Sequence, residues 1–248
     1  MPWLWLPRTS TASPSNACNR RSSQRLAQEG IRPDLLAGCS SGALFGATIA
    51  MGLDSDEALR LATHLWSQEL TQQRRWRAYV QMILPRLTGF GAGFAMRDDA
   101  LIARRVGAAF GDARLEQLPT PLRVAATSAT TGRPVVLTRG RVTDALRASM
   151  AVPIIFPSVE IDGQRLVDGV LSDPLPIAAA PEAAVVLTLG FTGDMPRRVD
   201  RLSRLVAQTS TTLINNLMHA RMAAAQAAGQ QVVAIDLALD RHVGLWDT

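Results

Sequence analysis

The segment Gly38–Gly42, with the sequence G-C-S-S-G, limits the fold of this chain more than any other segment. An apolar stretch at 33–38 leads into it, and a run of small, mostly apolar residues at 41–51 follows it. A turn of the G-x-S-x-G type holds its serine on a sharp bend between a strand and a helix. The pattern therefore predicts a buried strand over 33–38, Ser40 at the bend, and a helix over 41–51 that is buried on most sides.

The rest of the chain alternates between helical and strand-like patterns. The expected helices cover 23–29, 54–70, 98–110, 142–150 and 200–228, with a further helical piece over 74–87. The expected strands cover 122–127, 134–138, a hairpin over 159–167, 183–189 and 232–237. Such alternation predicts a layered α/β fold with a central, mostly parallel sheet and helices on both faces.

The first 22 residues differ from the rest of the chain. They are rich in Ser, Thr, Pro, Asn and Arg, show no sustained period, and contain no glycine, since the first glycine is Gly30. We therefore expect an irregular segment over 1–22 and one folded domain over 23–248. A length of 248 residues and a hydrophobic content of 47% suit one α/β domain, or at most two.

The distribution of charge bears on the kind of partner that the chain can bind. The net charge is +5, and every basic side chain other than histidine is arginine. These arginines are scattered rather than gathered in a stripe with aromatic residues, which argues against nucleic-acid binding. Their abundance reflects either an Arg-rich codon usage or an attraction to anionic phosphate head groups. Two cysteines, Cys18 and Cys39, do not form a disulfide framework, and Cys39 is either a small filler of the turn or a reactive thiol.

The apolar runs of the chain bear on its location. None reaches the ~18 residues of a transmembrane helix, and the apolar start Met1–Pro7 is too short for a signal peptide. We therefore expect a cytoplasmic protein that can contact a membrane at its surface.

The residue best placed to act with Ser40 is Asp168. It ends a predicted strand and is followed by Gly169, which lets another backbone segment approach closely. A carboxylate within reach of the Ser40 hydroxyl could take its proton as general base. The plainer alternatives are a tight turn at Ser40 without chemistry and a structural Asp-Gly turn at Asp168.

Histidine offers a second candidate base. The order Ser40, Asp168, then His219 or His242 fits a Ser–His–Asp esterase. His219 lies inside a predicted helix and His242 lies near the chain end, so both are interpreted as ordinary surface or packed residues.

Three segments together resemble the patatin-like phospholipases, in particular the short bacterial esterases of that family. They cover 26–44, 145–157 and 166–176, and Thr131-Gly132 lies between the first and second. The resemblance implies a three-layer fold and a Ser40–Asp168 dyad that hydrolyses acyl esters of lipids or small ester substrates. It implies no metal and no organic cofactor. It also places Ala148-Ser149 and Pro153 near the site, in a supporting role or as simple helix-end packing.

The sequence departs from the family pattern at three places. The family forms its oxyanion hole with a glycine-rich loop after the first strand, and no glycine stands in the corresponding region here. The amide of Ser41, at the start of the helix after Ser40, is the remaining candidate donor. Val170 stands where the family has Gly or Ala, and both ends of the chain are expected to be incomplete.

Two functions remain open at this point. The first is a serine acyl hydrolase weakened by the missing loop. The second is an inactive patatin-fold protein that binds lipid or a protein partner.

Overall fold

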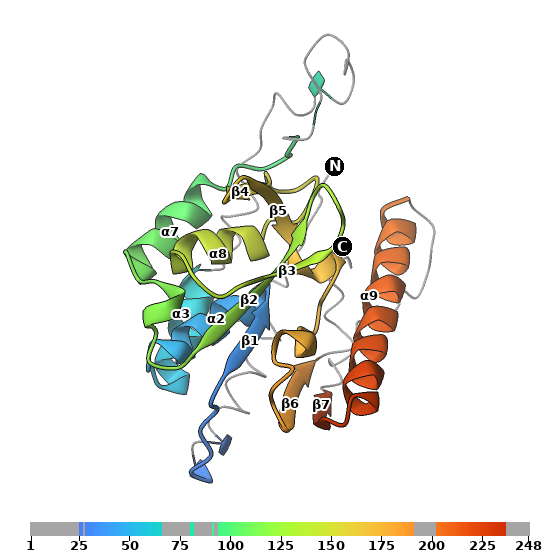
Figure 1. The fold of residues 1–248 in the computed structure, drawn as a ribbon. Helices are drawn as coiled ribbons and strands as arrows, with labels where there is room; N and C mark the ends of the chain where they lie inside the picture. Colours follow the sequence, from blue (N-terminus) through green and yellow to red (C-terminus); the bar gives the residue numbers. More distant parts are fainter. Residues whose placement is uncertain are drawn as a thin grey trace.

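The computed structural model describes residues 28–65, 94–190 and 202–236, together with 25, 26, 80, 81 and 91 (Figure 1). The segment 1–22, most of the helical piece predicted over 74–87, and His242 lie outside the described residues.

A five-stranded mixed sheet forms the larger part of the described fold. Strand β1 (Leu36–Cys39) pairs in parallel with β2 (Leu122–Ser128). Strands β3 (Pro134–Leu137) and β5 (Gln164–Asp168) both pair with β2 in antiparallel orientation. Strand β4 (Val159–Ile161) lies beyond β5 and is antiparallel to it.

Strands β1 and β5 occupy the same edge of β2, one after the other. β3 pairs with residues 124–127 of β2, so strands that pair with these same residues must lie on the other edge. There β1 ends with Cys39 opposite Ala125, and β5 ends with Asp168 opposite Ala126. Because β1 runs parallel to β2 and β5 runs antiparallel to it, the two strands approach each other head to head. The residues that follow them meet at this point.

Helices α2 (Ser41–Ala50) and α8 (Val142–Ser149) pack against the five-stranded sheet (Figure 1). Helix α3 (Ser55–Leu65) packs on α2, and α7 (Ala100–Phe110) packs on α8 and α3. The main core lies among these helices and β2. Its fully buried side chains include Leu44, Val106, Val124 and Leu146. Helix α2 is buried along most of its length, as its small apolar residues predict.

The remaining described elements form a second unit of strand and helix. Strand β6 (Val185–Gly190) pairs in parallel with β7 (Gln231–Asp236). The long helix α9 (Leu202–Ala227) packs on this pair through Ala225 and Met218. Figure 1 shows α9 on the side of the molecule opposite α2, α7 and α8.

The expected α/β class is confirmed, and the described sheet is mixed rather than mostly parallel. Its five-stranded part contains one parallel pair, β1 with β2, beside antiparallel neighbours. The predicted hairpin forms as β4 and β5, with Asp162 and Gly163 at positive φ (51° and 73°) in its turn. Hydrophobic periodicity reports which residues are buried, and it carries no information on strand direction.

Candidate active site

Ser40 lies on the bend between β1 and α2. Its backbone has φ 52° and ψ −119°, a conformation that residues other than glycine rarely adopt. Such strain persists only where the surrounding structure holds it in place. The predicted strand–turn–helix geometry is therefore present, with the serine side chain placed at the turn.

The structure brings Ser40 and Asp168 together. The Ser40 hydroxyl donates a hydrogen bond of 3.0 Å to Oδ2 of Asp168, across 128 positions of sequence. The head-to-head arrangement of β1 and β5 accounts for this contact, because each strand ends at the residue that delivers its side chain. His64 on α3 and His219 on α9 are exposed, so the partner of the serine hydroxyl is the carboxylate.

The Asp168 carboxylate is buried and hydrogen-bonded at both oxygens. Asp168 is only 1% exposed to solvent. Oδ1 accepts from the Val170 amide at 2.9 Å and from the Cys39 thiol at 3.7 Å. Burial raises the pKa of Asp168 to about 6, although the hydrogen bonds from Val170, Ser40 and Cys39 oppose this shift. The group is therefore an anion at neutral pH and a stronger base than a solvated aspartate.

Cys39 is a thiol in this site rather than a thiolate. Burial, and then the nearby Asp168 carboxylate, hold the pKa of Cys39 well above its ordinary value. A reactive thiolate is therefore disfavoured, and the side chain acts as a weak donor to Asp168. The interpretation of Cys39 as a mere filler missed this contact, since a local turn pattern does not reveal which residue of β5 lies beside it.

Gly38 and Gly42 flank Ser40, and Gly169 follows Asp168; at two of these three glycines a side chain would collide with backbone. A Cβ atom at Gly38 would lie 2.6 Å from Ala43 Cα, and one at Gly169 would lie 2.5 Å from the Ala125 carbonyl oxygen. Both glycines thus allow a close approach of backbone, as expected for Gly169. At Gly42 a Cβ would have nothing within 4 Å, so the space beside this glycine is open.

The oxyanion candidate Ser41 is the first residue of α2. Amides in the first turn of a helix have no partner within the helix, and the helix dipole adds positive potential there. The neighbouring amide of Ser40 is already used, because it donates to the Ser149 hydroxyl at 2.8 Å. A glycine-rich loop would have to come from the region before residue 25, which lies outside the described residues.

A comparison with protein-family models finds a match to the patatin-like phospholipase model over residues 17–181. This chain belongs to the patatin-like phospholipase family. The expectation drawn from the three sequence segments is thereby confirmed, and the match extends into the last residues of the segment 1–22.

Relatives of the patatin-like chain include proteins of two mycobacteria. An uncharacterized NTE family protein of Mycobacterium bovis and one of Mycobacterium tuberculosis are each 32% identical to it over 198 residues. The aligned part covers 75% of this chain and 51% of each relative, so the chain spans about half the length of these relatives. A second uncharacterized NTE family protein of Mycobacterium bovis is 30% identical over 153 residues, covering 62% of this chain and 24% of that protein.

A polar network that sequence analysis missed surrounds Asp168 and the loop that follows it. The Thr127 hydroxyl donates to the Asp168 carbonyl at 2.8 Å and lies 2.7 Å from the Ser172 hydroxyl. Arg221 of α9 donates to the Ser172 carbonyl at 2.8 Å, and its Nε lies 3.0 Å from Asp173 Oδ1. Helix α9 is thereby tied to the loop after Asp168. In the sequence, the only sign of this network is the acidic Asp173 between Ser172 and Pro174. Its partner Arg221 lies 48 residues further along the chain, in another element.

The described part of the patatin-like chain shows neither a metal cluster nor a membrane-spanning helix. No group of three or more His, Cys, Asp or Glu side chains in these residues could hold a metal ion. Among the same residues, no helix combines the length and apolar character needed to cross a bilayer.

Proposed function

We propose that this chain is a serine acyl hydrolase that cleaves carboxylic esters of lipids, with Ser40 as nucleophile and Asp168 as general base. Membership of the patatin-like family supports lipid hydrolysis in general. The observation that carries the specific proposal is the 3.0 Å hydrogen bond from the strained Ser40 to the buried Asp168. The substrate class covers phospholipids, lysophospholipids and simple carboxylic esters, which the protein would meet at a lipid surface or in solution.

The proposed reaction runs in two steps. Asp168 accepts the Ser40 proton as Oγ attacks the ester carbonyl, and it then gives that proton to the departing alcohol, which leaves an acyl group on Ser40. In the second step Asp168 takes a proton from water, the resulting hydroxide attacks the acyl carbonyl, and the proton returns to Ser40. A pKa of about 6 for Asp168 suits both halves, because the group must both gain and lose a proton near neutral pH.

The pH dependence of this reaction tests the proposal. We expect kcat/KM for p-nitrophenyl butyrate to reach a plateau above pH ~7 and to fall about tenfold per pH unit below ~6, because protonated Asp168 cannot act as base. The measurement is a pH–rate profile of the purified chain.

A second carboxyl group requires a control for this profile. Burial also raises the pKa of Asp173 to about 6, although the Arg221 guanidinium opposes the shift. The Asp173→Asn variant should therefore keep the acidic limb of the profile. A flat profile in this variant would assign the limb to Asp173 and contradict the role given to Asp168.

The oxyanion donors limit the rate that we expect. An oxyanion hole needs preorganised donors about 2.7–3.1 Å from the developing charge, and Ser41 supplies one candidate amide. No glycine precedes Gly30 in the chain. Replacing residues 1–22 with a strand that ends in a glycine-rich loop should therefore raise kcat by about 10²-fold or more. The check is a side-by-side ester assay of both proteins, each shown to be folded by circular dichroism. Equal rates would show that the original chain already has its donors.

The alternative function is an inactive patatin-fold protein that binds lipid or a protein partner. The same lack of glycine before Gly30 favours it. If the chain is inactive, neither the original chain nor the protein with residues 1–22 replaced should turn over the ester faster than the Ser40→Ala variant. If the chain is a hydrolase, at least the protein with the replaced segment should do so.

A further inference from the structure

The side chain of Ser149 connects the bend at Ser40 to the neighbouring strand. Its hydroxyl accepts a 2.8 Å hydrogen bond from the Ser40 amide and donates a 2.7 Å hydrogen bond to the Ala125 carbonyl on β2. Ala125 is the residue opposite Cys39, where β1 ends. The hydroxyl therefore bridges the backbone just after β1 and the backbone of β2, at the place where the chain leaves the sheet.

The Ser149 bridge gives the backbone amide at the strained bend a hydrogen-bond partner. The positive φ of Ser40 turns the chain sharply out of β1. A buried amide without a partner costs about 1–3 kcal/mol, and a strained φ/ψ pair persists only when its surroundings fix it. Ser149 is fully buried, and its one hydroxyl uses both its donor and its acceptor capacity here. It is therefore well placed to hold the amide of Ser40 in one orientation.

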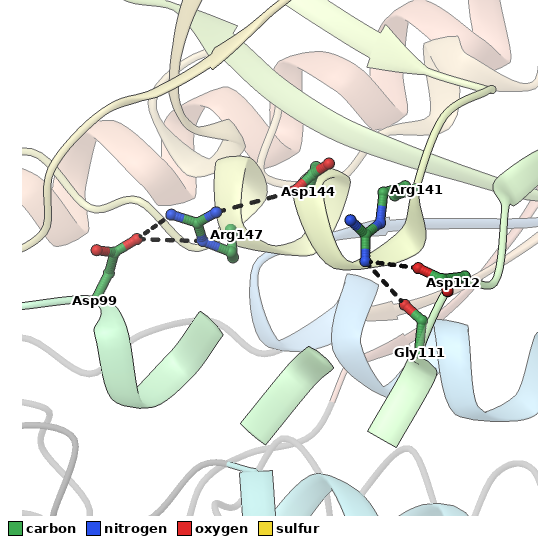
Figure 2. A network of polar contacts seen from close by, with 6 residues as sticks. All are labelled: Asp99, Gly111, Asp112, Arg141, Asp144 and Arg147. Carbon is green, nitrogen blue, oxygen red and sulfur yellow. Dashed lines mark hydrogen bonds and ion pairs between the residues drawn. The ribbon is translucent and has the colours of Figure 1, made fainter. Parts of the chain in front are cut away.

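The helix that carries Ser149 is itself held at both ends. Figure 2 shows Arg141, just before α8, and Arg147, within α8, reaching residues that flank the two ends of α7. Arg141, just before α8, lies 2.9 Å from Asp112 and contacts the carbonyl of Gly111 at 3.5 Å. Arg147, in the last turn of α8, lies 2.7 Å from Asp99, the residue before α7. These contacts restrict sliding of α8 along α7, and they keep the end of α8 against β2.

We propose that Ser149 is a positioning residue for the nucleophile: through its hydrogen bond to the Ser40 amide it fixes the direction of the Ser40 side chain toward Asp168. This inference rests on the proposed function. It also assigns the Ser40 amide a fixed partner, so that this amide is not an oxyanion donor. The contact is distinct from the dyad, because Ser149 meets the backbone of Ser40 and not its hydroxyl.

The test compares Ser149→Ala with a matched variant on the same helix. Thr143 of α8 is also buried, and its hydroxyl has no hydrogen-bond partner within the described structure. Thr143→Val therefore removes a buried hydroxyl from α8 without touching Ser40. At a temperature at which all proteins are folded, Ser149→Ala should lower kcat for p-nitrophenyl butyrate about 10- to 100-fold with little change in KM, since small misplacement of a reacting group has effects of this size. Thr143→Val should retain the wild-type kcat.

Amide hydrogen exchange of Ser40, followed by NMR, tests the contact without any need for turnover. The Ser40 amide should be protected in the wild-type chain and in Thr143→Val, and should exchange about 10-fold faster or more in Ser149→Ala. An unprotected Ser40 amide in the folded wild-type chain would overturn the proposal, as would unchanged kcat in Ser149→Ala. Wild-type turnover equal to that of Ser40→Ala would instead defeat the proposed hydrolase, and the exchange experiment would still decide the contact.

Discussion

Replacing Ser40 with alanine, or Asp168 with asparagine, is expected to lower kcat/KM for p-nitrophenyl butyrate by about 10⁴-fold or more. Alanine removes the attacking oxygen. Asparagine keeps the shape of the side chain but cannot accept the serine proton, and its amide has no charge to stabilise the proton in transit. Residues that act as a unit show strongly non-additive effects. The double variant should therefore be no slower than the slower of the two single variants.

The hairpin of β4 and β5, which ends at Asp168, supplies a control for the Asp168 substitution. Asp162 also precedes a glycine, but it is exposed in the turn between β4 and β5. Its backbone has φ 51°, which asparagine tolerates well. Asp162→Asn should keep wild-type activity. If Asp168→Asn retained most of the activity while Ser40→Ala lost it, another group would have to be the base.

The second large effect is expected in stability. Gly38→Ala should lower the free energy of unfolding by about 3 kcal/mol or more, because the new methyl group would lie 2.6 Å from Ala43 Cα and 2.7 Å from its amide nitrogen. Backbone atoms of α2 cannot move aside as a flexible side chain can. For a chain of this size the corresponding loss in Tm is roughly 6–12 °C. Thermal unfolding followed by circular dichroism measures it.

Gly42→Ala is the matched substitution within the same motif. A methyl group at Gly42 meets nothing within 4 Å, and the residue lies in α2, where alanine is favoured over glycine. Its Tm should equal or slightly exceed that of the wild type. A Tm in Gly38→Ala as high as that in Gly42→Ala would mean that the approach of α2 to β1 is looser than the contact distances at Gly38 indicate.

Local signals in the sequence account for much of what the structure contains. The strand before Ser40, the small-residue helix after it and the hairpin turn at Asp162-Gly163 each follow from residues that are neighbours in the chain. Asp168 is likewise marked by a local pattern, a strand end followed by glycine. Whether Ser40 and Asp168 perform catalysis remains a prediction, which their contact supports.

The parts that could not be predicted depend on pairing between distant segments. The antiparallel pairing of β5 with β2 determines that Asp168 meets Cys39 and Ser40, and no periodicity specifies that partner. The bond between Ser149 and Ser40 joins positions 109 apart, and a serine near a helix end is common without such a contact. Arg221 likewise gave no local sign that it would contact the loop after Asp168.

The burial of Asp168 has a consequence for how this chain can evolve. Because its pKa in the folded protein, about 6, lies above the ordinary value of 3.8, the folded state binds the proton more tightly than the unfolded chain does. Stability therefore decreases as the pH rises from about 4 to 6, and at neutral pH the buried anion lowers it by roughly 3 kcal/mol. A neutral residue of similar shape would escape this penalty. Selection for stability alone would thus favour loss of the carboxylate, so a lineage that keeps Asp168 buried and charged reveals selection on chemistry rather than on folding.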